Sequence, residues 1–337
     1  MRTETILLNP ERNVSLTVYL QPVGGEYGRI ERRPAALVIP GGGYHFCSDR
    51  EAEPVALAYL KAGYQAFVLR YSLDAQAAWP HPLDDYEQAM GMIRDNAEEW
   101  HVAADRIAVI GFSAGGHLAA CAATMSKNRP NAAILGYPVI DGVCARDYLP
   151  SAPDVIAHVD GNTCPCFVFA TRTDNLVPVS NTIHMVNALC ENDVAFESHI
   201  YSNGKHGLST GDASIEGDVF SERYPRWVED SLSWLADVLG GITPGGLTDP
   251  RFGAKINGNR EEKLNLDCTI AHLMKSAPAR KVLDEFLPGW DKGTPGAAAG
   301  VIRLRDGLTY RGLDAKTVAD IEAALNAIDN PDSAARG

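Results

Sequence analysis

Residues Ile107 to Ala120 read IAVIGFSAGGHLAA, and this stretch decides the fold. Its first four residues are apolar, which is typical of a short buried strand. Ser113 follows with a glycine two positions away on each side, and a helix rich in small residues is expected from Gly116 to about Met125. Glycines allow the chain to turn sharply from strand to helix while the serine oxygen stays exposed in a strained conformation. The pattern predicts that Ser113 is a nucleophile; the alternative is a structural turn with a spectator serine.

A second glycine-rich stretch, Pro40 to Tyr44, reads PGGGY and follows the apolar run Ala35 to Ile39. Because glycines carry no side chain, their N–H groups can approach a substrate oxygen closely. The helix after the serine also directs its first N–H groups and its positive dipole end toward this space. Tyr44 is predicted to be a substrate-binding side chain. The predicted donors to an oxyanion are the N–H groups of Gly42, Gly43 and Ala114.

Strands and helices alternate along most of the chain. Residues 5–20 contain two alternating segments around a turn and are expected to form an antiparallel edge hairpin. Alternation of this kind is typical of the α/β class, with a mostly parallel sheet covered by helices on both faces. The later strands are expected at residues 35–39, 65–69, 107–110, 132–135, 166–170 and 196–201.

An acid and a base follow two of these strands. Because the working groups of an α/β sheet lie at the carboxyl ends of its strands, Asp174 and His206 are expected near Ser113. Serine is a weak nucleophile until a neutral imidazole can take its proton, and a carboxylate then orients that imidazole. The order Ser, Asp, His along the chain is a known order for such a triad. We therefore predict the catalytic triad Ser113, Asp174 and His206.

Each triad member has a competitor in the sequence. Asp141 also follows a strand, but it comes one strand early and is more typical of a turn or cap. His206 stands in a glycine-flanked loop, which favours a catalytic role. The other candidate histidines lie within predicted helices or strands, where packed or surface positions are the usual interpretation; they are His117, His184 and His199.

The composition is that of an ordinary globular protein. The 337 residues are 45% hydrophobic and 22% charged, with a formal net charge of −13. This negative balance argues against nucleic-acid or anionic-membrane partners. No signal-peptide pattern or membrane-spanning run is apparent, so a cytoplasmic protein is expected. The seven cysteines are scattered, which favours reduced thiols, and no Cys/His spacing predicts a metal site.

A change of composition at residues 240–250, GGITPGGLTDP, indicates a domain boundary. We predict a catalytic domain over residues 1–243 and a small helical domain over residues 251–337. The C-terminal part has helical patterns at residues 264–287 and 314–328, and nothing in it suggests chemistry. For its role, self-association into a homo-oligomer is preferred over a lid. Residues 141–163 are irregular and are a candidate for a small cap over the site.

Residues 35–240 resemble the α/β-hydrolase superfamily, in particular its carboxylesterase and acetyl-esterase branch. The hormone-sensitive-lipase-like branch begins its glycine loop with His, whereas this chain has Pro40, which argues against that branch. The resemblance implies Ser113, Asp174 and His206 as the triad. It is carried by the glycine loop and serine motif above and by Arg70-Tyr71-Ser72, His81-Pro82-Leu83-Asp84-Asp85, Asp105-Arg106, Asp174-Asn175-Leu176-Val177-Pro178-Val179 and Gly204-Lys205-His206-Gly207.

Together the motifs are similar to those of acetyl-xylan and feruloyl esterases. This implies a serine carboxylic-ester hydrolase (EC 3.1.1) that removes acetyl groups from sugars or xylo-oligosaccharides through an acyl-enzyme, with no metal or organic cofactor. The alternatives are a feruloyl or general short-chain carboxylesterase, a serine peptidase or amidase, and a non-enzymatic binding protein on the same scaffold. The region after residue 260 more weakly resembles a helical module appended to some carbohydrate-active enzymes, which favours a sugar substrate.

Overall fold

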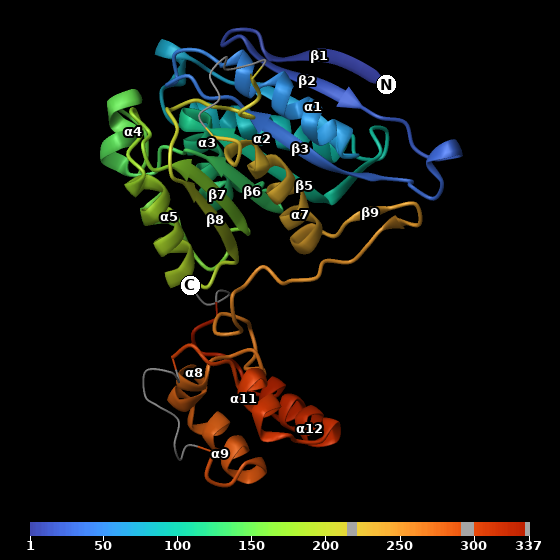
Figure 1. Cartoon of the computed structure of the whole chain (residues 1–337), viewed down its shortest axis with the longest axis vertical. Helices are drawn as coiled ribbons and strands as arrows, with labels where there is room; N and C mark the ends of the chain where they lie inside the picture. Colours follow the sequence, from blue (N-terminus) through green and yellow to red (C-terminus); the bar gives the residue numbers. More distant parts are fainter. Residues whose placement is uncertain (214–220, 291–299, 334–337) are drawn as a thin grey trace. The chain divides into compact units, whose positions relative to one another are not determined.

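The structure is a computed structural model that describes residues 1–213, 221–290 and 300–333 (Figure 1). The chain divides into two compact units, Met1–Ala254 and Lys255–Gly337. The sequence predicts the boundary between residues 243 and 251, slightly before the one in the structure, which follows Ala254. Within the described ranges, no helix has the length and apolar character needed to cross a membrane.

The first unit is built on an eight-stranded sheet in the order β1-β2-β4-β3-β5-β6-β7-β8. The first two strands form the predicted edge hairpin: β1 pairs antiparallel with β2, and β2 pairs antiparallel with β4. All the other neighbouring strands are parallel, as the sequence predicts. The strands are β1 (Arg2–Asn9), β2 (Val14–Leu20), β3 (Arg33–Ile39), β4 (Gln65–Arg70), β5 (Val102–Phe112), β6 (Ala132–Gly136), β7 (Cys166–Thr171) and β8 (Phe196–Tyr201).

Helices cover both faces of the sheet (Figure 1). Buried residues of α2, α3 and α5 belong to one hydrophobic cluster, and those of α1 and α7 belong to the other. A short hairpin of β9 (Ile242–Thr243) and β10 (Gly246–Leu247) follows helix α7. The helices are α1 (Glu53–Lys61), α2 (His81–Asp95), α3 (Ser113–Met125), α4 (Gly142–Tyr148), α5 (Ser180–Glu191) and α7 (Trp227–Leu239).

Strand β5 shows why this sequence forms a central strand. Ile107 and Val109 lie in the cluster shared with α2 and α3, whereas Ala108 and Ile110 lie in the cluster shared with α1 and α7. Successive residues of a strand point to opposite faces, and helices cover both faces of this sheet. All four side chains are therefore fully buried. Burying one large aliphatic side chain contributes about 1.5–3 kcal/mol. An apolar run without polar alternation therefore fits a strand covered on both sides.

Strand β5 and helix α3 begin well before the starts that the sequence predicts. Strand β5 begins at Val102, five residues before the apolar run, where it pairs with Arg33 of β3. Helix α3 begins at Ser113, three residues before the predicted start at Gly116. Small residues at the first turn leave room for the helix to start directly at the end of the strand.

The second unit has a helical core of its own, formed by residues such as Leu273, Leu283, Leu304 and Ile321. Side-chain oxygens accept hydrogen bonds at three helix starts and thereby cap them. Helix α11 lies outside the two helical patterns that the sequence predicts. The helices are α8 (Ile270–Lys275), α9 (Ala277–Phe286), α11 (Leu304–Arg311) and α12 (Ala315–Asn326).

A buried histidine in α3 makes the stability of the first unit dependent on pH. His117 is fully buried, its Nδ1 lies 2.7 Å from the hydroxyl of Tyr44, and its Nε2 lies 3.1 Å from the carbonyl oxygen of Pro153. Burial lowers the pKa of His117 to about 4. Below the ordinary histidine pKa, the unfolded chain binds a proton that the folded chain excludes. Stability is therefore lost as the pH falls from about 6.5 toward 4.

We expect the wild type to lose about 2–3 kcal/mol more unfolding free energy than His117→Gln between pH 7 and pH 4.5, because glutamine does not titrate. Urea unfolding followed by circular dichroism at both pH values measures this difference. Equal losses in the two proteins would show that His117 does not contribute to the pH dependence.

Candidate active site

The turn from β5 to α3 presents Ser113 as the sequence predicts. Ser113 has a φ of 53°, an uncommon value for a residue with a side chain, and it is the first residue of α3. A Cβ at Gly111 would lie 2.2 Å from the carbonyl oxygen of Gly115. A Cβ at Gly115 would lie 2.2 Å from the carbonyl oxygen of Ile39. Both glycines are therefore required by close backbone contacts that hold the serine in place.

His206 and Asp174 form a hydrogen-bonded chain with this serine. The Nε2 atom of His206 lies 2.8 Å from Oγ of Ser113, and its Nδ1 atom lies 2.7 Å from Oδ2 of Asp174. An ionised carboxylate only accepts hydrogen bonds, so Nδ1–H donates to Asp174 and Nε2 is free to accept the serine proton. This is the arrangement that a serine nucleophile and its general base require.

The carboxylate of Asp174 is held by the backbone on its other side. Its Oδ1 accepts hydrogen bonds from the N–H groups of Leu176 and Val177, both at 2.9 Å, and its side chain is only 1% exposed. The neighbouring Asn175 accepts the N–H of His206 through its side-chain oxygen at 3.0 Å. The loops after β7 and β8 are therefore fixed to one another, which orients the imidazole.

The competing residues lie elsewhere. The Asp141 carboxylate pairs with His184 Nδ1 at 2.9 Å, and His199 Nε2 pairs with Glu197 at 2.7 Å. His117 is buried in α3, as described above. None of these side chains is hydrogen-bonded to Ser113 within the described residues.

The glycine loop after β3 lies beside the serine. Gly42 and Gly43 line the same cavity as Ser113 and His206, and both have positive φ values, 133° and 62°. A Cβ at Gly42 would lie 2.0 Å from the carbonyl oxygen of Phe46. In the described part of the chain, the N–H groups of Gly42, Gly43 and Ala114 donate to no backbone or side-chain acceptor. Three donors of the kind needed for an oxyanion are therefore available next to Ser113.

The prediction that Tyr44 binds substrate through its side chain is wrong. Tyr44 is only 2% exposed, its hydroxyl bonds to His117, and its ring packs edge-on against Tyr71. The loop reverses direction at the glycines, so this side chain enters the core between α3 and β4 instead of the cavity.

The cavity at Ser113 has a volume of about 350 Å³. Several lining residues are not among the predicted site residues, and they include Phe46, Glu51, Tyr148 and Leu176. Tyr148 is the last residue of α4, so the segment predicted to be a cap contributes to the wall. Phe46 and Leu176 are each 60% exposed and form an apolar rim. The sequence signal for Phe46, Glu51 and Leu176 is their closeness along the chain to predicted motifs, and the signal for Tyr148 is its place in the predicted cap.

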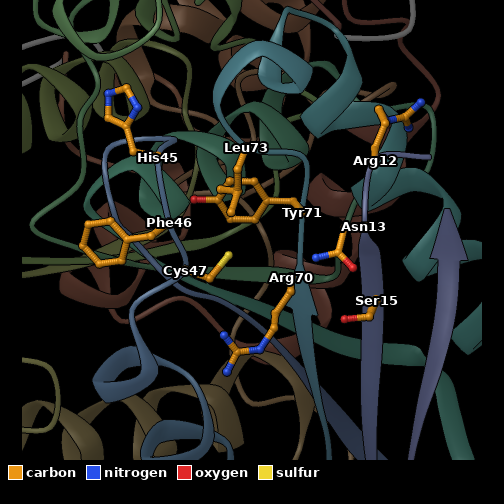
Figure 2. Close-up of a pocket in the computed structure, with 9 residues that line it drawn as sticks. All are labelled: Arg12, Asn13, Ser15, His45, Phe46, Cys47, Arg70, Tyr71 and Leu73. Carbon is orange, nitrogen blue, oxygen red and sulfur yellow. The ribbon is translucent and has the colours of Figure 1, made fainter. Parts of the chain in front are cut away.

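A second cavity of about 390 Å³ shares His45 and Phe46 with the first. Figure 2 shows Asn13 and Ser15 on one side of it and Phe46 on the other, with Arg70 between them. Its lining combines polar side chains with Phe46, Tyr71 and Leu73, so it is more polar than the first cavity.

Among the residues that the structure describes, no group of three or more His, Cys, Asp or Glu side chains is placed to hold a metal ion. The groups gathered at Ser113 are those of nucleophilic catalysis.

Comparison with known proteins agrees with this geometry. The family BD-FAE matches residues 26–148, and the prolyl oligopeptidase family matches residues 145–241. The solved structure of MGS-M1, an α/β-hydrolase enzyme from a deep-sea metagenome library of the Medee basin, is 44% identical. That match covers 71% of this chain and 98% of the other, with a TM-score of 0.66. The chain belongs to the α/β-hydrolase superfamily.

Other relatives carry more specific names. A solved acetyl ester-xyloside bifunctional hydrolase from Caldicellulosiruptor lactoaceticus is 28% identical over 71% of this chain and 98% of its own, with a TM-score of 0.63. Endo-1,4-beta-xylanase B of Butyrivibrio fibrisolvens is 33% identical over 53% of this chain. An acetylxylan esterase of Xylanibacter ruminicola is 29% identical over 60% of this chain. The matches span only 33% and 45% of the lengths of these last two proteins.

Replacing the candidate acid tests the triad. We expect Asp174→Asn to lower kcat by about 10⁴-fold, because an asparagine favours the wrong tautomer of His206 and cannot stabilise its charged form. The matched control is Asp141→Asn, which changes the competing aspartate in the same way and should leave kcat within twofold. Hydrolysis of 4-nitrophenyl acetate measures both; a large loss in the Asp141 variant alone would reverse the assignment.

Replacing a loop glycine tests the oxyanion donors. We expect Gly42→Ala to lower kcat by about 10²–10³-fold, because the new Cβ forces the loop away from the carbonyl of Phe46 and displaces the N–H groups. Gly25→Ala is the control, since Gly25 also has a positive φ of 56° but no atom within 4 Å of an added Cβ. Steady-state kinetics distinguish the two; equal small effects would show that the loop does not bind the oxyanion.

Proposed function

We propose that this chain is a serine carboxylic-ester hydrolase that removes acetyl groups from sugars or short xylo-oligosaccharides. The observation that carries the proposal is the hydrogen-bonded chain from Ser113 through His206 to Asp174, which opens into a cavity beside the glycine loop.

In the proposed reaction, Oγ of Ser113 attacks the ester carbonyl while Nε2 of His206 takes its proton. The oxyanion of the tetrahedral intermediate accepts hydrogen bonds from the N–H groups of Gly42, Gly43 and Ala114. The intermediate then collapses, the imidazolium protonates the leaving alcohol, and an acyl-enzyme remains. Water attacks that ester as His206 takes its proton. The imidazolium then returns the proton to Oγ of Ser113 as the acid leaves.

Two features support a small acyl group. Tyr148 lies over the glycine loop, where a Cβ at Gly43 would approach its ring to 3.3 Å. The ring therefore limits the space next to the proposed oxyanion donors. The relatives named acetylxylan esterase and acetyl ester-xyloside hydrolase favour acetate as the acyl group.

The second cavity supports an alcohol that carries many hydroxyl groups. Within the described residues, the side chains of Asn13 and Ser15 make no hydrogen bond and are therefore free to bind such hydroxyls. Phe46 stands between the two cavities with an exposed ring, which suits the apolar face of a sugar. An acetylated sugar could place its ester at Ser113 and its further rings in the second cavity.

The peptidase and feruloyl-esterase alternatives have less support than the acetyl-esterase proposal. The match to the prolyl oligopeptidase family covers only residues 145–241, and the described residues contain no propeller domain of the kind such peptidases usually carry. The apolar rim of Phe46 and Leu176 would suit a feruloyl group, which keeps that esterase as the second candidate. Cytoplasmic location and self-association through the C-terminal unit remain predictions.

A substrate series tests the proposal. We expect kcat/KM to fall from 4-nitrophenyl acetate to the butyrate and octanoate, and we expect acetate release from acetylated xylo-oligosaccharides. Ser113→Ala should abolish both. The double variant Asn13→Ala/Ser15→Ala should raise KM for the oligosaccharide alone. Preference for octanoate or a feruloyl ester, or no release from the sugar, would contradict the acetyl-sugar proposal and leave an esterase of other specificity.

A further inference from the structure

A buried carboxylate outside the triad connects the two loops that the proposed reaction needs. Glu51 ends a short 3-10 helix, Asp49–Glu51, and is only 3% exposed. Its Oε2 accepts the N–H of Gly41 at 2.8 Å, and its Oε1 accepts the hydroxyl of Tyr137 at 2.6 Å. Both oxygens therefore hold protein groups at the wall of the catalytic cavity, which Glu51 also lines.

Tyr137 connects Glu51 to His206, because it contacts both side chains. Its ring packs edge-on against the imidazole of His206, with ring centroids 4.9 Å apart. Its hydroxyl, which donates to Glu51, also accepts the N–H of Ser209 at 3.1 Å. Ser209 comes three residues after His206, and its own hydroxyl donates to the carbonyl of Arg50. The loop that carries His206 is therefore connected to Arg50 directly and to Glu51 through the hydroxyl of Tyr137.

The other contacts of Ser209 leave little freedom in this network. Ser209 is fully buried, and its carbonyl accepts the indole N–H of Trp227 at 2.9 Å. Tyr137 is 2% exposed and sits at a φ of 35°, a conformation that the surrounding contacts must maintain. A buried carboxylate that accepts two hydrogen bonds is costly to leave unpaired, so such networks specify one arrangement.

We propose that Glu51 is a positioning residue that holds the glycine loop and, through Tyr137, the imidazole of His206 in one reactive geometry. This inference rests on the proposed function, because it assigns Glu51 to the same site. Glu51 acts in two ways. It fixes Gly41, directly before the proposed oxyanion donors Gly42 and Gly43. Its negative charge also faces His206 and stabilises the imidazolium that forms when Ser113 loses its proton.

Several charged and titratable groups surround Glu51 and His206. Tyr137, Arg50 and His206 face Glu51, and burial raises the pKa of Glu51 while the hydrogen bonds from Tyr137 and Gly41 oppose that rise. Asp174, Tyr137 and Glu51 face His206. Removing the negative charge of Glu51 therefore takes away a carboxylate that stabilises the imidazolium of His206 during the reaction.

The main test is Glu51→Gln, which keeps the side-chain shape but has only one oxygen for two donors. We expect kcat for 4-nitrophenyl acetate to fall about 10- to 100-fold with little change in KM, because the reacting groups lose their alignment. Glu53→Gln is the control, since that carboxylate pairs with Arg70 outside the catalytic cavity; it should stay within twofold.

Tyr137→Phe tests the path to His206 and serves if Glu51→Gln fails to fold. The phenylalanine keeps the ring against the imidazole and removes only the hydroxyl. We expect a loss of similar size, and the double variant should lose little more than the larger single loss, because both changes break one network. Circular dichroism and Tm verify that the variants are folded.

The rate at which a fluorophosphonate labels Ser113 separates this inference from the proposed function. Labelling needs an activated serine and its oxyanion donors but no particular ester, and both variants should slow it at least tenfold. A wild type that labels rapidly yet hydrolyses no ester would remove the esterase proposal alone. Labelling and kcat within twofold of wild type in both folded variants would overturn the role of Glu51.

Discussion

The close approach of Gly115 to the end of β3 is the contact on which the site depends. An added Cβ at Gly115 would lie 2.2 Å and 2.3 Å from the carbonyl oxygens of Ile39 and Pro40. This contact brings the first turn of α3 against the strand that leads into the glycine loop. Ser113 and two of the three proposed oxyanion donors, Gly42 and Gly43, come from segments about 70 residues apart. Only a glycine at position 115 lets the two backbones meet.

The remaining groups reach the same place because of the parallel sheet. Strands β3, β5, β7 and β8 run in the same direction, so their carboxyl ends lie at one edge. The loops after β7 and β8 then bring Asp174 and His206 to Ser113, and hydrogen bonds from Leu176 and Val177 fix the acid. Because these contacts are already formed in the folded protein, the site needs no costly reorganisation when the reaction takes place.

The sequence predicted the parts of the site that depend on strand order and on glycine. The parallel sheet, the edge hairpin and the meeting of Ser113, Asp174 and His206 follow from apolar runs and from the residues that end them. The direction in which a loop side chain points depends on backbone angles that the sequence does not reveal. Tyr44 was therefore placed in the cavity, although it packs in the core against His117 and Tyr71.

Glu51 was missed for a related reason. It lies in a polar segment that reads as an ordinary surface loop, and only the fold buries it between Gly41 and Tyr137.

Treatment of the wild type with a fluorophosphonate, followed by mass spectrometry of the modified peptide, tests directly whether Ser113 is the nucleophile. We predict one phosphonyl group per chain, on Ser113, and none in Ser113→Ala. No labelling, or labelling of another serine, would contradict it.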